Sequence, residues 1–226
     1  MTDMMQHDDP AFFFPAPRLQ HFCGQCGTAI TRRIPPGDNR ERDLCEKCGA
    51  VHYQNPRMVV GTVPVWENKI LLCLRAIEPR ANTWTLPAGF MELAESTAEG
   101  AERETREEAG AHINLGHLYT VIDIPQVDQV HIYFLAHVTS PELDPGPESL
   151  DAKFFALDEI PWDNLSFRSV STTLKHYIRD QANGRFETRH FSLATTRPYS
   201  SKWHGAARCV FPGSNMTIHF HLSNKH

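Results

Sequence analysis

The middle of the chain contains apolar runs with the length and composition of β-strands. Residues 58–66 and 69–75 are two such runs, and the Glu67-Asn68 pair between them predicts a β-hairpin. Three later runs predict further strands, at residues 115–124, 130–138 and 153–157. None of these runs approaches the ~20 apolar residues that a membrane-spanning helix requires, which argues against a membrane protein.

Two segments show the period of an amphipathic helix. The first is predicted over residues 97–109, because Ser96 and Glu99 match a capping box and Gly110 follows the last turn. The second is predicted over residues 167–181. Its buried stripe comprises Val170, Leu174, Tyr177 and Ile178. Strands mixed with two helices predict an α/β sandwich with a mixed sheet.

The two ends of the chain lack such periodicity. Residues 1–19 are expected to be a flexible leader, and residues 184–226 an irregular, His-rich, basic tail. The first residues are acidic and lack the basic start of a secretory signal, so we expect a cytoplasmic protein. With 226 residues, the chain has room for one domain and an appendage, and its net charge of −5 argues against nucleic acid as a general partner.

The appendage is predicted at residues 20–55, where large apolar residues are scarce and cysteines are paired. Two CxxC pairs are separated by 18 residues, and they comprise Cys23, Cys26, Cys45 and Cys48. This spacing is typical of a zinc ribbon, in which four thiolates surround one structural Zn²⁺. His21 and His52 lie nearby and are alternative ligands. Metal binding would supply the folding energy that so small a core lacks.

Three glutamates gather on one side of the first predicted helix. At 100° per residue, Glu104, Glu107 and Glu108 fall within an arc of about 100°. Such an arrangement is repulsive unless a cation neutralises it, and carboxylate oxygens suit Mg²⁺ or Mn²⁺. The alternative is a solvated acidic face, with Arg103 and Arg106 as surface ion-pair partners.

The segment around this helix resembles the signature of the Nudix hydrolase superfamily, Gly-x5-Glu-x7-Arg-Glu-U-x-Glu-Glu-x-Gly-U, where U is a bulky aliphatic residue. Every fixed position matches: Gly89, Glu95, Arg103, Glu104, Glu107, Glu108 and Gly110. The two U positions hold the smaller Thr105 and Ala111. The resemblance implies a Nudix α/β/α sandwich at residues 56–183. It also implies that the three helix glutamates, with the Ala88 carbonyl, ligate catalytic metal, and that Arg103 pairs with Glu95.

A zinc ribbon followed by this signature is similar to the arrangement in a subgroup of the superfamily. That subgroup contains the plant chloroplast FAD and ADP-ribose pyrophosphatases and their bacterial relatives. This likeness covers about residues 21–182 and implies a small-molecule nucleotide substrate. The activity implied is magnesium-dependent hydrolysis of the pyrophosphate bond of ADP-ribose or FAD, which gives AMP and a phosphate monoester. Two alternatives stay open: an NAD(H) pyrophosphatase, although the SQPWPFP-type motif of that group is missing, and a non-catalytic nucleotide-sensing protein.

Several side chains outside the three helix ligands are candidates for the chemistry. Glu107 and Glu148 are the catalytic candidates for general base, with Asp151 as a third. Arg75 and Arg80 flank the predicted metal loop and suit phosphate groups, because a guanidinium matches phosphate geometry. Members of the superfamily are often dimers, so a homodimer is also expected.

Overall fold

The structure, a computed structural model, describes residues 20–193. Residues 20–55 contain a three-stranded antiparallel sheet in the order β1-β2-β3, with bounds Thr31–Arg33, Arg42–Leu44 and Val51–His52. The expectations for the leader at residues 1–19 and for the chain beyond residue 193 lie outside the described residues. Within residues 20–193, no helix is both long and apolar enough to cross a bilayer.

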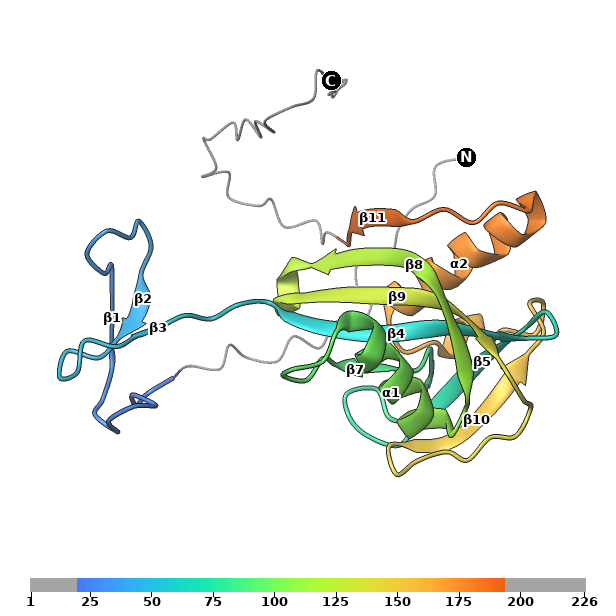
Figure 1. Ribbon diagram of the computed structural model, residues 1–226, viewed down its shortest axis with the longest axis horizontal. Coiled ribbons are helices and arrows are strands. Elements are labelled where there is room, and N and C mark those ends of the chain that lie inside the picture. Colours follow the sequence, from blue (N-terminus) through green and yellow to red (C-terminus); the bar gives the residue numbers. More distant parts are fainter. Residues whose placement is uncertain (1–19, 194–226) are drawn as a thin grey trace, which may run out of the picture. The chain divides into compact units, whose positions relative to one another are not determined.

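The rest of the described chain forms a mixed eight-stranded sheet with two helices (Figure 1). Its strands are β4 (Arg57–Trp66), β5 (Lys69–Arg75), β6 (Trp84–Thr85), β7 (Ala88–Phe90), β8 (Ile113–Ile124), β9 (Gln129–Val138), β10 (Ser149–Phe155) and β11 (Arg189–Ser192). The helices are α1 (Thr97–Ala109) and α2 (Arg168–Asn183). The main path runs β10-β5-β4-β9-β8-β11, with β6 paired to β5 and β7 to β4.

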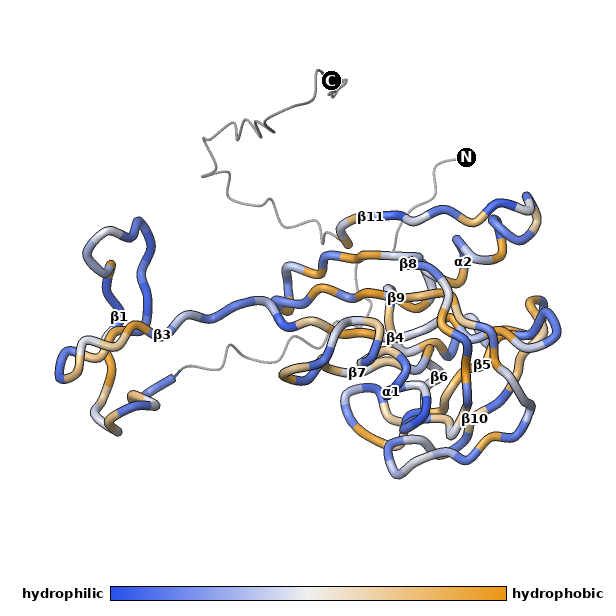
Figure 2. Tube along the Cα trace, in the orientation of Figure 1, coloured by the Kyte–Doolittle hydropathy of each residue, from blue (hydrophilic) through white to orange (hydrophobic). Residues whose placement is uncertain are grey.

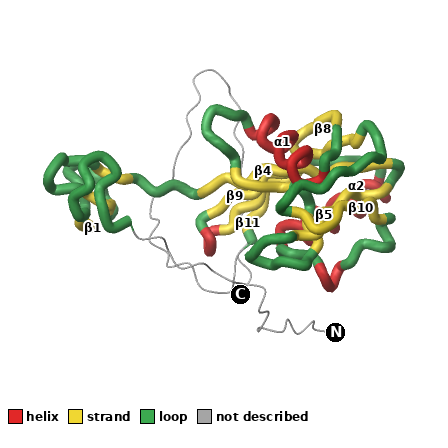
Figure 3. The backbone as a smooth tube through the Cα atoms, turned by 90° about the horizontal axis from the view of Figure 1, so that it is seen from below, coloured by secondary structure: helices red, strands yellow, loops and turns green. Residues whose placement is uncertain are grey.

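The two helices cover opposite faces of this sheet. Side chains alternate along a strand, and on β5 Leu72 packs in the cluster that contains Leu174 of α2. Leu71 and Cys73 instead pack with Ala109 of α1. Figure 3 shows the two helices on either side of the strands, and Figure 2 shows that the central strands are the most apolar segments. The predicted α/β/α sandwich with a mixed sheet is confirmed.

Local chemistry explains the elements that the pattern predicted well. Glu67 and Asn68 both have positive φ, at 46° and 64°, which is typical of the tight turn that joins twisted strands. The capping box at the start of α1 is present, since the Ser96 hydroxyl accepts from the Glu99 N–H and the Glu99 carboxylate accepts from the Ser96 N–H. Gly110 ends α1 in the left-handed conformation, with φ of 66°.

The structure differs from the predictions at three segments. The strand predicted at residues 153–157 runs over Ser149–Phe155 instead. Its first half has no buried apolar residue, since Leu150 is exposed, and it contains a register shift between Ser149 and Asp151. Residues 84–85 and 88–90, which lie outside the predicted strands and helices, form β6 and β7. The tail expected to be irregular from residue 184 contains β11, which pairs in parallel with β8.

An ion pair explains why β11 joins the sheet despite its polar sequence. Arg189 donates through both guanidinium nitrogens to Asp180 on α2, and Tyr119 of β8 donates its hydroxyl to the same carboxylate at 2.9 Å. Asp180 is 2% exposed, so this pair lies in the protein interior. Burial acts to raise the pKa of the Asp180 carboxyl, but the hydrogen bonds from Arg189 and Tyr119 hold it below its usual value.

Candidate active site and metal centres

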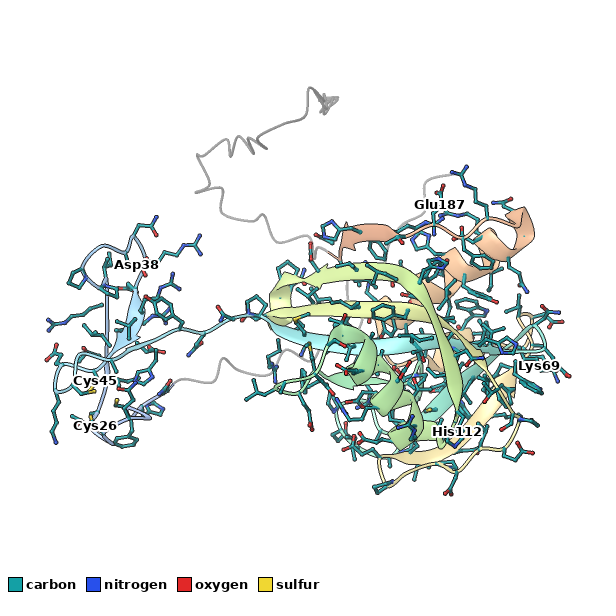
Figure 4. All side chains as sticks on the ribbon, in the orientation of Figure 1. Cys26, Asp38, Cys45, Lys69, His112 and Glu187 are labelled. Carbon is teal, nitrogen blue, oxygen red and sulfur yellow. The ribbon has the colours of Figure 1, made fainter. Side chains whose placement is uncertain are left out.

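The four cysteines of residues 20–55 converge on one point. Their sulfur atoms all lie within 4.8 Å of one another, with 3.6 Å from Cys23 to Cys48 and 3.5 Å from Cys26 to Cys45. Four sulfurs at ~2.3 Å from a tetrahedral zinc ion would be ~3.8 Å apart, so the cluster has the dimensions of a Cys₄ zinc site. Figure 4 labels Cys26 and Cys45 in this cluster.

The backbone of each CxxC segment is shaped for metal binding. Gly27 and Gly49, one residue after each pair, adopt φ of 68° and 74° and donate their N–H groups to Cys23 and Cys45 carbonyls at 2.8 Å. Positive φ is inexpensive only for glycine, which explains its place in both turns. Four thiols would fill every position of a tetrahedral zinc site, without a histidine ligand. His52 Nε2 instead contacts the Cys23 sulfur at 3.3 Å.

The acidic helix α1 faces the short strand β7, which contains Gly89, the first residue of the signature. A Cβ at Gly89 would collide with the Glu104 carboxylate, so a residue without a side chain is required for this approach. The neighbouring Ala88 N–H donates to the Glu108 carboxylate at 3.1 Å. Strand β7 itself pairs with β4, where a Cβ at Gly61 would collide with Ala88. Two glycines thus allow strand, loop and helix to meet at one point.

Arg103 is the centre of the hydrogen-bond network at this point. It forms the expected ion pair with Glu95, at 3.0 Å from Nε and 2.8 Å from Nη2. Its Nη1 donates to Glu104 at 2.7 Å and to Glu107 at 2.9 Å, and Nη2 donates to the Phe90 carbonyl. The hydrogen bonds from Arg103 hold the pKa of Glu95 at about 2, so this carboxylate stays charged. Arg103 therefore fixes the loop before α1 to the helix and neutralises part of the acidic cluster.

The three helix glutamates differ in burial. Glu104 and Glu108 are 9% and 7% exposed, whereas Glu107 is exposed to solvent. Burial raises the pKa of the Glu108 carboxyl to about 8, against the hydrogen bond from Ala88, and burial also raises the pKa of Glu104. Within residues 20–193, only the four cysteines bring three or more candidate ligand atoms within 4.8 Å of one another, so the glutamates are more open than the zinc cluster.

The donor set nevertheless fits a hard divalent cation. Two buried carboxylates with unfavourable burial energies, one exposed carboxylate on the same helix and backbone carbonyls of β7 are oxygen ligands of the kind that Mg²⁺ and Mn²⁺ prefer. Arg103 pairs with Glu104 and Glu107, and the Ala88 N–H orients Glu108. The sequence predicted these residues as metal ligands, and the structure gathers them at the junction of β7 and α1.

The loop before β10 brings a fourth carboxylate toward the helix. A Cβ at Gly146 would collide with the Glu107 carbonyl, so this loop packs directly on the end of α1. Glu148, two residues later, is exposed, and its charge acts to raise the pKa values of Glu104 and Glu108. Asp151 accepts the N–H of Ala152 at 2.9 Å and is exposed. The close contact of Gly146 with α1, which places Glu148 near the helix glutamates, could not be predicted from the sequence.

The two arginines expected to bind phosphate lie in different surroundings. Arg75 donates to the Pro79 carbonyl at 3.1 Å, stacks over Phe167 at 5.2 Å and acts electrostatically to lower the pKa of Glu108. Arg80 instead lines a cavity at the start of α2. The contact between Arg75 and Phe167 was not predicted from the sequence, because the two residues lie far apart in the chain and Phe167 belongs to no motif.

Comparison with known proteins agrees with this geometry. The chain is 33% identical, over 131 residues, to the ADP-ribose pyrophosphatase of Methanocaldococcus jannaschii; the match covers 56% of this chain and 76% of that protein. It is 31% identical to the NAD-capped RNA hydrolase NudC of Stutzerimonas stutzeri over 63% of this chain, and the match spans half the length of that relative.

A crystal structure of a NUDIX hydrolase from Nitrosomonas europaea is similar over 76% of this chain and 99% of that one, with 44% identity and a TM-score of 0.73. Residues 21–54 match the family described as Nudix N-terminal, a zinc ribbon. Residues 55–174 match the family described as NUDIX domain. The chain therefore belongs to the Nudix family, with a zinc ribbon on the N-terminal side of its Nudix domain.

Proposed function

We propose that this Nudix protein hydrolyses the pyrophosphate bond of a nucleoside diphosphate linked to another moiety, with ADP-ribose as substrate and FAD as a second one. The main support is the complete carboxylate set at the β7–α1 junction, where buried Glu104 and Glu108 lie beside exposed Glu107. Two buried carboxylates whose burial opposes ionisation are unfavourable unless a cation neutralises them.

Burial divides the roles among the four carboxylates. Glu104 and Glu108 are shielded from water and suit the holding of Mg²⁺ or Mn²⁺, together with the Ala88 carbonyl. When bound, the cation would neutralise diphosphate oxygens and lower the pKa of an attacking water. Glu107 and Glu148 are exposed at the same place, so they are the carboxylates that a water molecule reaches, and we propose them as the general-base candidates.

Side chains around α1 would position the substrate. Arg75 is held by its hydrogen bond to Pro79 and its contact with Phe167, so its guanidinium is oriented before substrate binds. A fixed guanidinium suits the phosphate oxygens of the substrate. The Arg103–Glu95 pair holds the loop that precedes α1 and so maintains the spacing of the ligands. Phosphoryl chemistry depends mainly on such positioning and electrostatics.

The identity of the second moiety is inferred from relatives. The name of the M. jannaschii relative specifies ADP-ribose, which would give AMP and ribose 5-phosphate. The name of the NudC relatives specifies NAD-capped RNA, so NAD(H) is the second candidate and an RNA end carrying it a third. A cytoplasmic location and a homodimer stay predictions.

A substrate panel tests the proposal. Purified protein with Mg²⁺ would be incubated with ADP-ribose, FAD, NADH and an NAD-capped oligonucleotide, and the products identified by mass. We expect AMP and ribose 5-phosphate to form fastest. Preferential cleavage of NADH or of the capped oligonucleotide would overturn the choice of ADP-ribose.

Matched helix variants test whether the carboxylate set catalyses hydrolysis. We expect Glu108→Gln to reduce kcat by at least a hundredfold, because a buried ligand loses its charge. Glu102→Gln removes the same charge from the same helix at a position outside the carboxylate network and should leave kcat within twofold. Full activity of Glu108→Gln, or nucleotide binding without turnover in the wild-type protein, would refute hydrolysis at this site.

A further inference from the structure

A cavity of about 230 Å³ opens at the start of α2, separate from the carboxylate face of α1. Its wall includes Arg80 from the loop after β5, Asp163 from the turn before α2, and the first residues of the helix itself. Arg75 does not line this cavity, but it stacks on Phe167, which does. The cavity is thus adjacent to the arginine that we place beside the metal site.

The polar atoms of this wall suit an anion. Helix α2 has no side-chain cap, because the N-cap position is occupied by Phe167. The first N–H groups of a helix have no partner within it, and they carry partial positive charge. Ser166 lies in the same wall and is 2% exposed, and its hydroxyl is without a hydrogen-bond partner among residues 20–193. A buried, unpaired hydroxyl is unfavourable unless a ligand satisfies it.

Two guanidinium groups add full positive charge. Arg80 is half-buried and its guanidinium forms no ion pair within the described part of the chain. Its backbone N–H donates to the Glu78 carboxylate at 2.9 Å. Arg168 lines the cavity at the first position of α2. With Asp163 as the one acidic side chain of the wall, the cavity has an excess of one positive charge, to which the helix end adds.

Asp163 narrows the class of ligand. A carboxylate repels a free dianion but accepts hydrogen bonds from the hydroxyl groups of a sugar. The remaining wall is partly aromatic, with Trp162 and Phe167, which suits the apolar face of a sugar ring. The same wall therefore holds arginines and N–H groups for a phosphate together with an acceptor for sugar hydroxyls.

We propose that this cavity is a binding site for a phosphorylated sugar, with the phosphate group at Arg80, Arg168 and the first N–H groups of α2. Ser166 donates its hydroxyl to the same phosphate, and Asp163 accepts from the sugar. The site extends beyond the proposed function, because it requires neither the catalytic metal nor turnover.

Calorimetry on the full-length protein without added Mg²⁺ tests the site with two probes, ribose 5-phosphate and inorganic phosphate. We expect ribose 5-phosphate to bind at least fivefold more tightly than inorganic phosphate, and the Arg80→Gln/Arg168→Gln double variant to bind it at least tenfold more weakly. Arg179→Gln removes one charge near the other end of α2 and should change the affinity less than twofold. In an NMR titration, the amide signals of residues 168–170 should shift.

The outcomes separate this site from the catalytic proposal. Binding that is unchanged in the double variant, or amide shifts confined to α1 and β7, would overturn the cavity site even if the protein hydrolyses ADP-ribose. Equal affinities for the two probes would overturn the sugar assignment. Binding that persists in a hydrolysis-dead Glu108→Gln variant would support the cavity site independently of activity. Equal melting temperatures of the variants would show that they are folded.

Discussion

Replacement of Arg103 by Gln should destabilise the protein without Mg²⁺ and much less with it. Arg103 donates to Glu95, Glu104 and Glu107 at once, so its loss leaves three carboxylates close together without their cation. In the wild-type protein, a divalent ion at Glu104 competes with the hydrogen bond that Arg103 donates to this carboxylate. In the variant no such bonds are displaced, so the ion should stabilise the variant more than the wild type.

The expected size follows from the exposure of each pair. The Arg103 and Glu104 side chains are 23% and 12% exposed, and a charge-assisted hydrogen bond of this kind contributes about 1.5–3 kcal/mol. Glu107 is 59% exposed, and solvent screening limits its pair to at most about 0.5 kcal/mol. The metal-free variant should therefore lose at least about 1.5 kcal/mol, which lowers Tm by about 3–6 °C in a domain of this size.

Thermal unfolding followed by circular dichroism measures both parts of this prediction. At one saturating Mg²⁺ concentration, the deficit shrinks by RT ln of the ratio of the two Kd values, so a variant that binds the ion about fivefold more tightly recovers about 1 kcal/mol, more than half of its deficit. Arg106→Gln is the matched control, because Arg106 is exposed on the same helix and should lose less than 2 °C. A deficit of the same size with and without Mg²⁺ would refute a shared site for the arginine and the ion.

Three other perturbations give separate tests. Gly89→Ala should fold normally but lose at least tenfold in kcat, because its methyl group displaces the Glu104 carboxylate; a kcat unchanged from wild type would contradict the close packing of β7 on α1. Asp180→Asn should lower the free energy of unfolding at neutral pH. The pKa of Asp180 in the folded protein lies below its ordinary 3.8, so the stability advantage of the wild type should be lost as the pH falls from 3.8 through this lowered pKa. Chemical denaturation at pH 7 and pH 3 would measure the difference in free energy of unfolding between wild type and variant. An equal difference at both pH values would contradict the Asp180–Arg189 ion pair. Cys45→Ser should reduce bound zinc from one ion per chain, as measured by elemental analysis, and retention of a full equivalent would argue against four-cysteine ligation.

Short-range signals in the sequence predicted much of this fold. The hairpin turn at Glu67-Asn68 and the capping box at Ser96 act within a few residues, so each is readable without knowledge of the partner segments. The CxxC pairs are equally local, and their spacing alone brought the four thiols to one predicted site. The acidic face of α1 followed from helix geometry, which is why its glutamates could be identified before the sheet was known.

Features that depend on distant segments could not be predicted in the same way. Strand β11 has no apolar pattern, and it is ordered by Asp180 of α2 and by pairing with β8. The close approach of Gly146 to α1 and the stacking of Arg75 on Phe167 likewise join segments far apart in the chain. Ser166 belongs to no motif, and only its unpaired, buried hydroxyl distinguishes it as a ligand-binding candidate.

The position of β11 has a practical consequence for anyone who shortens this protein. Strand β8 spans Ile113–Ile124, and β11 pairs with its Thr120–Asp123 stretch, on the side opposite β9. A chain cut after Gly184 would end at the last helix and would lack β11. The backbone N–H and C=O groups of Thr120–Asp123 would then be free to pair with a strand of another molecule. Unprotected edges of this kind invite chain-to-chain aggregation. Truncated forms of the Nudix domain should therefore extend at least to Leu193.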